Sequence, residues 1–284
     1  TKNKTPEELE DAIGLLGASI NVRSTNEEII ISVNTLTKNF EKTLALVEEM
    51  LLEPRWDEEQ FALAKSRIVN NLKRNTANPD YLASRTLNKL VYGDNILAFD
   101  ATGTEETVSS ITIDDLKDFY DKYFTPSLAR FVVAGDLDKE RVEAALAGIN
   151  ARWQPKEVSA PEFKQPLPPE KPVVYLVDVP GAKQSVINIG TPSIPRSHPD
   201  FYAATVANYK LGGSFNGIFN LILREEKGFT YGARSSFSGG KNFGAFTASS
   251  RVRTNATLES VTIFKTEMEK YRKEIPQEYV DFTK

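Results

Sequence analysis

The chain has 284 residues, of which 40% are hydrophobic, and its 35 basic and 39 acidic residues leave a net charge of −4. This length favours two domains with a sizeable core, and the interspersed, nearly balanced charges do not imply a polyanionic partner such as nucleic acid. No apolar run approaches the length of a membrane span, and the absence of cysteine excludes disulfides while leaving the redox compartment open.

The first half of the chain predicts alternating helices and strands. Thr5-Pro6-Glu7-Glu8 is a capping box with proline in the first turn, and apolar residues follow it at helical spacing. The other predicted helices cover residues 39–52, 59–74 and about 80–91. The predicted strands cover residues 17–23, 27–33 and 128–134. This mixture is typical of an α+β domain.

A proline-rich segment divides the chain. Six prolines fall between Pro155 and Pro172, and prolines at this density continue neither a helix nor a central strand. We therefore predict a first domain over residues 1–154, an ordered and extended linker over residues 155–170, and a second domain over residues 171–284.

The second half predicts the same kinds of element. Residues 173–179 and 185–190 are predicted strands of one sheet. Two further strands begin at Gly232 and are broken by the polar segment 238–242. A helix is predicted over about residues 257–272.

The two halves resemble copies of one unit, because similar residues recur at a slowly drifting offset. The matched pairs are Gly17 with Gly232 at 215 positions, Met50 with Met268 at 218, and Phe61 with Phe282 at 221. Such a drift is typical of duplication with small insertions. The alternative is that any two α+β units share a strand–turn–strand–helix order.

The segment Leu223-Arg-Glu-Glu-Lys-Gly-Phe-Thr-Tyr231 predicts the end of a helix, a glycine stop and the start of a strand. Gly228 stands where a helix needs a left-handed cap. Arg224 and Tyr231 therefore flank one tight turn, and both side chains donate hydrogen bonds to oxygen. Such a pair suits a peptide carbonyl, or the oxyanion that forms when that carbonyl is attacked. The alternative is a common helix–glycine–strand turn with a solvated arginine.

This segment and the preceding Leu211-Gly-Gly-Ser-Phe215 resemble the second-domain signature of the pitrilysin and insulysin zinc metallopeptidases, the inverted zincins. The closest branch is the bacterial one related to mitochondrial processing peptidase, and the resemblance covers nearly the whole chain. It implies an α+β fold of two duplicated domains, each a mainly antiparallel sheet with helices packed on one face. It also implies that the second copy is incomplete at its C-terminal end.

The chemistry that the family performs with zinc is missing from this sequence. Catalytic members bind zinc through an inverted His-x-x-Glu-His helix and a downstream glutamate, whereas this chain has one histidine, His198. The resemblance places the zinc helix just before Thr1, so the motif could have been cut off rather than lost. The third ligand position, however, is Asn71, and an amide is a weak zinc ligand. We therefore expect no metal site and no cofactor in this chain.

The resemblance implies the non-catalytic half or subunit of a zinc-dependent metalloendopeptidase. Zinc and the general base would belong to a partner half, on the same polypeptide or on a separate chain. Arg224 and Tyr231 would assist catalysis in trans, by binding a substrate carbonyl and the developing oxyanion of an unfolded peptide. The residues expected to bind substrate nearby are Gly212, Gly213, Ser214 and Phe215. Alone, the chain is expected to be inactive.

Three alternatives remain open. The first is a truncated catalytic half whose zinc motif lies upstream. The second is a proteolytically inactive scaffold, similar to the core proteins of the respiratory cytochrome complex. The third is a generic α+β binding module, which requires the duplication to be accidental.

The compartment of the protein also stays open. No signal peptide is visible, and the chain starts at Thr1 without methionine, as a fragment would. A bacterial source would favour the periplasm or cell envelope.

Overall fold

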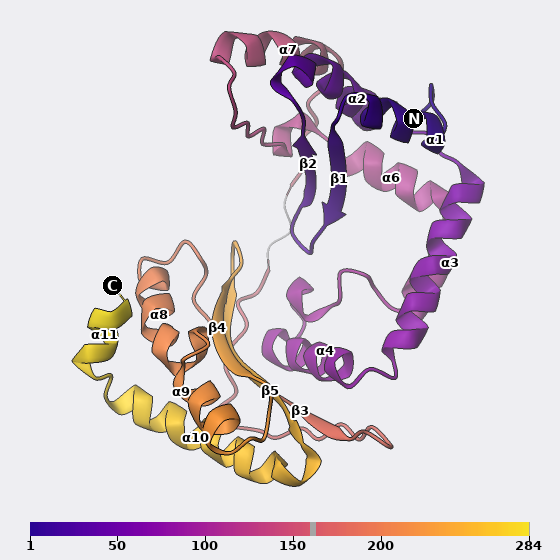
Figure 1. The fold of residues 1–284 in the computed structure, drawn as a ribbon. Coiled ribbons are helices and arrows are strands. Elements are labelled where there is room, and N and C mark those ends of the chain that lie inside the picture. The colour runs from indigo at the N-terminus through magenta and orange to yellow at the C-terminus, as the bar shows by residue number, and fades with distance from the viewer. Residues whose placement is uncertain (160–162, 284) are drawn as a thin grey trace. The chain divides into compact units, whose positions relative to one another are not determined.

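The computed structural model describes residues 1–159 and 163–283 and shows an α+β protein with small antiparallel sheets (Figure 1). The chain divides into two compact units. The first contains Thr1–Asn70, and the second contains Asn71–Asp100 together with the segment that starts at Phe163. The predicted α+β class with antiparallel sheets is confirmed. The predicted domain boundaries stay a prediction.

The predicted linker is described only in part. Residues 155–159 and 163–170 form neither helix nor strand. Residues 160–162, which include Pro161, lie outside the described residues.

In the part of the chain that the structure describes, no helix is both long and apolar enough to cross a membrane.

The first unit combines a β-hairpin with helices. Its elements are α1 (Pro6–Leu15), β1 (Ser19–Ser24), β2 (Ile29–Asn34), the 3-10 turn η1 (Thr37–Asn39), α2 (Phe40–Leu52), α3 (Glu58–Asn75, whose end belongs to the second unit), α5 (Glu105–Ser110), α6 (Ile113–Tyr123), the 3-10 turn η3 (Pro126–Leu128) and α7 (Lys139–Arg152). The predicted capping box opens α1, because the Thr5 hydroxyl accepts from the Glu8 N–H and the Glu8 carboxylate accepts from the Thr5 N–H. The hairpin strands pair antiparallel, with Ser19 opposite Asn34.

Helix α2 supplies much of the core of the first unit. Phe40, Leu44, Val47 and Leu51 recur every three or four residues, which places them on one buried helix face. That face packs against Ile149 of α7. The helix predicted over residues 39–52 is therefore present, and its apolar residues at helical spacing build this core.

The second unit is built on a three-stranded antiparallel sheet with the order β3-β5-β4. Its elements are α4 (Pro79–Tyr92), the 3-10 turn η2 (Ile96–Ala98), β3 (Gln184–Ser193), α8 (Phe201–Asn208), the π-helical turn η4 (Tyr209–Gly213), α9 (Ile218–Asn220), the π-helical turn η5 (Leu221–Glu226), β4 (Ala233–Gly239), β5 (Gly244–Arg253), the 3-10 turn η6 (Thr254–Ala256), α10 (Thr257–Lys273) and α11 (Gln277–Thr283). Figure 1 shows α8, α9 and α10 beside this sheet.

Strand β3 contacts helices on both faces of the sheet. Ile187 belongs to the buried cluster that contains Phe219 of α9 and Phe264 of α10, and the rings of these two phenylalanines lie 4.7 Å apart between centroids. Successive side chains of a strand point to opposite faces, so Gly190 points the other way. A methyl group on Gly190 would lie 3.0 Å from Leu87 of α4. Helix α4 therefore covers the face of β3 opposite to α9 and α10.

The same order of elements occurs in each unit. A hairpin is followed by a 3-10 turn and a long helix, as β1–β2–η1–α2 in the first unit and β4–β5–η6–α10 in the second. Gly17 and Gly232 each stand just before the first strand of their hairpin. Both the predicted duplication and its alternative expect this shared order, so the duplication stays a prediction.

Two predicted strands are wrong. Residues 128–134 and 173–179 are not strands, and their side chains are largely exposed, with Val132 at 89% and Val174 at 87%. A strand forms where a neighbouring strand completes its backbone hydrogen bonds. Among the described residues, no strand pairs with either segment. The apolar pattern alone was therefore not sufficient to make these segments strands.

Candidate substrate-binding site

The predicted substrate-binding loop starts in η4 and packs closely against β4. Gly212 is buried, and a methyl group on it would lie 2.6 Å from Phe219 Cδ2 and 2.7 Å from the backbone nitrogen of Ser235. Only a residue without a side chain allows this close approach of loop and strand. The other predicted loop residues have accessible surface, and they are Gly213, Ser214 and Phe215.

Arg224 contacts this loop through the Phe215 ring. The guanidinium carbon lies 4.5 Å from the ring centroid, a cation–π geometry that orients the planar guanidinium. The Phe215 side chain is 66% exposed, and about a third of the Arg224 side chain is also accessible. Arg224 Nη1 lies 3.0 Å from Glu225 Oε1. Arg224 is thus held by a ring and a carboxylate, and its guanidinium has further N–H donors.

The turn after Arg224 has the predicted glycine stop. Gly228 has a φ of 60°, in the left-handed region, and its N–H donates to the Arg224 carbonyl at 3.1 Å. Lys227 joins this turn to α10, because its ammonium lies 3.0 Å from the Glu259 carboxylate. The hydrogen bond with Glu259 raises the pKa of Lys227. A cation at this position also suits the carbonyl end of the helical segment.

Tyr231 is 91% exposed, but the backbone around it is anchored. The Thr230 hydroxyl oxygen accepts from the Gly232 N–H at 3.0 Å, and the Ser250 hydroxyl of β5 donates to the Gly232 carbonyl at 2.9 Å. Within the described chain, no hydrogen bond or ring contact joins Tyr231 to Arg224. The structure therefore presents the phenol to solvent from a fixed backbone.

The described residues do not fit a zinc site. Asn71 is exposed on α3, and its Oδ1 lies 3.5 Å from the Arg74 guanidinium, whose positive charge opposes a cation there. No group of three His, Cys, Asp or Glu side chains among residues 1–159 and 163–283 could hold a metal ion. His198 Nδ1 instead accepts from the backbone N–H of Asp200 at 3.1 Å.

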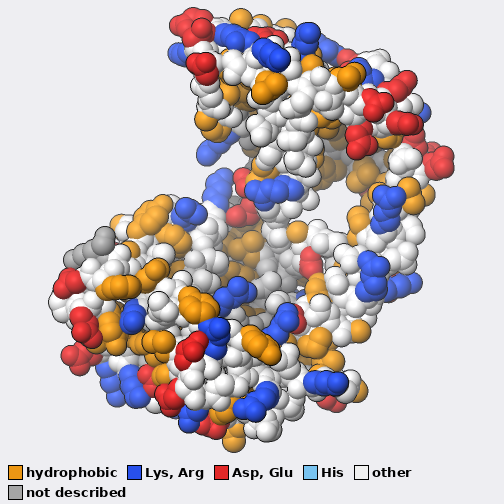
Figure 2. Space-filling view, viewed as in Figure 1, with side chains coloured by type: hydrophobic (Ala, Val, Ile, Leu, Met, Phe, Trp, Pro, Cys, Tyr) orange, Lys and Arg blue, Asp and Glu red, His pale blue; other side chains and the backbone are white. Residues whose placement is uncertain are grey.

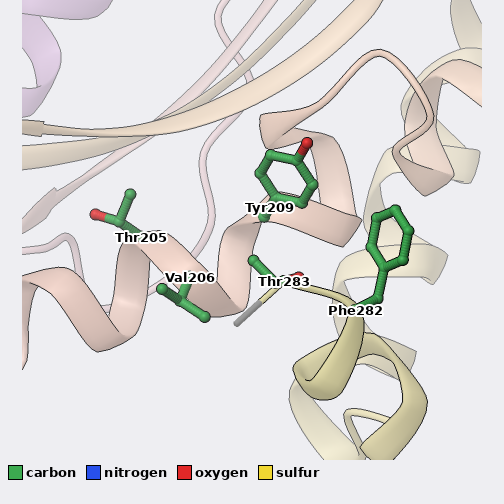
Figure 3. A pocket seen from close by; sticks show the side chains of 5 residues that line it. All are labelled: Thr205, Val206, Tyr209, Phe282 and Thr283. Atoms are coloured by element: carbon green, nitrogen blue, oxygen red, sulfur yellow. The ribbon is translucent and has the colours of Figure 1, made fainter.

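A surface hollow of about 420 Å³ lies between α8 and the end of α11 (Figure 3). Its lining residues are Thr205, Val206, Tyr209, Phe282 and Thr283. None of them is a predicted site residue, and the lining offers no charged side chain. The candidate site is therefore the exposed surface around Arg224 rather than this hollow.

Basic and acidic side chains are interspersed on the face of the molecule shown in Figure 2. This distribution agrees with the near balance of 35 basic and 39 acidic residues in the sequence. Proteins that bind nucleic acid typically carry a continuous basic patch or stripe on their surface. The face shown in Figure 2 carries no such patch.

Asn208 and Asn220 are two buried amides next to this loop in the chain, and the sequence analysis missed both. Asn220 interrupts the apolar stretch Ile218-Phe-Asn-Leu-Ile-Leu223. A buried amide must be hydrogen-bonded, so a polar residue within an apolar helical stretch is the signal that would have selected it.

Comparison with known proteins places these features in a family. The family described as "Peptidase M16 inactive domain" matches residues 110–284, and the family described as "Insulinase (Peptidase family M16)" matches residues 1–105. A Bacillus subtilis protein named "Uncharacterized zinc protease YmxG" is 25% identical over 250 residues, which cover 87% of this chain and 59% of that protein. A Helicobacter pylori protein named "Non-peptidase homolog YmxG" is 26% identical over 224 residues, which cover 78% of this chain and 51% of that protein.

A solved structure shares the fold over almost the full chain. The peptidase M16 inactive domain from Pseudomonas fluorescens superposes with a TM-score of 0.89 at 24% identity, covering 99% of this chain and 68% of that one. At this identity the likeness shows the fold alone. The chain spans only 59% and 51% of the two YmxG proteins that it resembles. Since the inactive-domain family alone matches more than half of its residues, the chain belongs to peptidase family M16.

Proposed function

We propose that this chain is the non-catalytic half of a two-half zinc metalloendopeptidase, and that its second unit binds the backbone of an unfolded peptide substrate. The observation that carries this proposal is the Arg224 guanidinium stacked on the exposed Phe215 ring at 4.5 Å. Zinc and its ligands would be supplied by a different half, because the described residues of this chain do not fit a metal site.

Arg224 supplies donors that suit a substrate carbonyl. A guanidinium has five N–H groups in a fixed plane, and the contact with Glu225 uses only part of them. The Phe215 ring holds that plane in one orientation, which reduces the entropy lost when a carbonyl binds. The exposed surface of Phe215 would at the same time contact an apolar side chain of the peptide. Arg224 would therefore bind substrate both before and during the reaction.

Tyr231 supplies a single O–H donor from an anchored turn. In the proposed enzyme its hydroxyl would donate to the carbonyl oxygen as that oxygen becomes negative. An interaction that strengthens only as charge develops raises turnover without tightening substrate binding. Arg224 and Tyr231 would therefore have separable kinetic effects.

A structural subunit without protease activity is the second candidate. The contact between Arg224 and Glu225 at 3.0 Å favours it, because a partnered arginine must weaken that contact before it binds another acceptor. The name of the Helicobacter relative, a non-peptidase homolog, points in the same direction. This candidate predicts that the surface around Arg224 binds no peptide.

Binding of a fluorescein-labelled, unstructured peptide to this chain tests the choice between the two candidates. Arg224→Ala should weaken binding by about tenfold to a hundredfold, the effect of losing a charged hydrogen bond. Arg272→Ala removes an exposed arginine from α10 and should leave binding unchanged. Equal binding by both variants and the unaltered chain would favour the structural subunit.

Steady-state kinetics test the role of Tyr231 in an assembled enzyme that contains the zinc-bearing half. Tyr231→Phe should lower turnover by about two to three orders of magnitude and leave substrate binding nearly intact. Tyr202→Phe removes another exposed phenol hydroxyl, on α8, and is the matched control. Full activity of Tyr231→Phe would assign the turn a purely structural role.

A further inference from the structure

A buried amide joins the parts of the candidate site. Asn220 is the last residue of α9, and it is only 3% exposed. Its Nδ2 donates to the Phe215 carbonyl at 2.8 Å, and its Oδ1 accepts from the Ala233 N–H at 3.1 Å. The two partners determine the amide orientation, because a carbonyl requires the nitrogen and an N–H requires the oxygen.

These two hydrogen bonds connect three elements of the site. Phe215 carries the ring on which Arg224 stacks, and Ala233 begins β4 two residues after Tyr231. Asn220 itself precedes Arg224 by four residues in the continuous helical segment formed by α9 and η5. One side chain therefore sets the spacing of the loop, the helical segment and the turn.

We infer that Asn220 is a positioning residue for peptide binding at this surface, an inference that rests on the proposed function. It acts by holding the Phe215 backbone, and through the Phe215 ring it orients the Arg224 guanidinium. Misplacing a binding group by about 1 Å lowers activity by up to about a hundredfold. Loosening this loop should therefore have a measurable effect on binding.

Asn208 provides a matched control. It is also buried, and both of its hydrogen bonds go to Ser235 of β4. Asn208 Nδ2 donates to the Ser235 carbonyl at 2.9 Å, and Oδ1 accepts from the Ser235 hydroxyl at 2.6 Å. These bonds tie α8 to β4 without involving Phe215 or Tyr231. Losing them should destabilise the second unit, including the packing under Gly212 and Gly213, without acting directly on the contact between Phe215 and Arg224.

Asn220→Asp is the informative variant. It keeps an oxygen that accepts from the Ala233 N–H, but it replaces the donor to Phe215 with a carboxylate oxygen that repels the Phe215 carbonyl. Asn208→Asp makes the same chemical change at the control position. Peptide affinity is measured by fluorescence anisotropy with the labelled, unstructured peptide, and the melting temperature is measured for each variant.

Asn220→Asp should weaken peptide binding about tenfold or more, whereas Asn208→Asp should change it by less than about twofold at a similar loss of melting temperature. In an Arg224→Ala background the effect of Asn220→Asp should become smaller, because part of it acts through that guanidinium. Equal weakening by the two aspartate variants, or full additivity with Arg224→Ala, would overturn the inference.

Hydrogen exchange over residues 214–217 separates this inference from the proposed function. If Arg224→Ala leaves peptide binding unchanged, the proposed function fails. Faster exchange in Asn220→Asp but not in Asn208→Asp would then still support the role of Asn220 in holding the loop, and unchanged exchange would overturn it. If Asn220→Asp does not fold, Asn220→Gln is judged by the same criteria, since it keeps both amide groups on a longer side chain.

Discussion

Gly212→Ala tests the close packing of the candidate loop against β4. The added methyl group would lie 2.6 Å from Phe219 Cδ2 and from Ser235 Oγ, and 2.7 Å from the Ser235 backbone nitrogen. Atoms at these distances overlap, and a paired strand cannot move aside as a flexible side chain would. Overpacking of this kind typically costs about 1–3 kcal/mol of unfolding free energy.

Gly213→Ala is the matched control, because both glycines lie in η4 and alanine has a higher helix propensity than glycine by about 1 kcal/mol at each position. A methyl group on Gly213 would approach Asn208 no closer than 3.1 Å, which small shifts can relieve. The difference between the two variants therefore isolates the overlap. We expect Gly212→Ala to be less stable by about 1–3 kcal/mol, or about 2–12 °C in melting temperature.

Thermal unfolding of the second unit should be followed by circular dichroism. Trp56 and Trp153 both lie in the first unit, so tryptophan fluorescence reports on that unit and identifies its transition separately. The dichroism transition of the second unit should shift down in Gly212→Ala relative to Gly213→Ala. Equal melting temperatures for the two variants would refute the packing argument.

Three other features give testable expectations. Phe264 is fully buried against Phe219, so Phe264→Ala should cost about 3–5 kcal/mol in urea unfolding, and a loss below about 1 kcal/mol would contradict this role. Hydrogen bonds from Arg141 lower the pKa of Glu41 to about 2, below its ordinary value. The stabilisation is therefore present at neutral pH and lost as pH falls through that value. The difference in melting temperature between the unaltered chain and Glu41→Gln should shrink from pH 7 to pH 2, and a constant difference would count against the ion pair. Elemental analysis after incubation with zinc should find no stoichiometric metal, and one tightly bound zinc per chain would refute the non-catalytic reading.

The sequence predicted well the structural features that depend only on residues close together in the chain. The capping box at Thr5 and Glu8 opens a helix in the structure as in the sequence, because the hydrogen bonds that define it lie within four residues. The stop at Gly228 is confirmed for the same reason, since its positive φ depends on one residue.

Elements that depend on distant partners were predicted less well. Residues 128–134 and 173–179 have the apolar composition of strands, but strand pairing requires a second segment that composition does not identify. Helix α4 was predicted correctly as a helix, yet its packing against β3 joins residues about 100 positions apart. The periodicity of a single segment does not show which distant segment it contacts, so the sequence did not predict this packing.

The contact between Arg224 and Phe215 also could not be predicted from helical periodicity. The Lys227 N–H donates to the Ile222 carbonyl five residues earlier, which marks a π-helical turn. Such a turn shifts the side chain of Arg224 away from a period of 3.6 residues, and Phe215 lies in the loop between η4 and α9, where helical periodicity does not apply. The turn pattern selected Arg224 and the resemblance selected Phe215, but neither predicted that their side chains stack.

The residues of the candidate site divide into those that the fold requires and those that it does not. Gly212 is required by its close approach to β4, and Gly228 by its positive φ. Phe215 and Tyr231 are exposed aromatic side chains that lie outside the buried clusters. An exposed phenol on an anchored turn adds little to the free energy of unfolding, so folding does not account for its presence. The proposed function would account for it, because a guanidinium oriented by a ring at Arg224 would suit a peptide carbonyl.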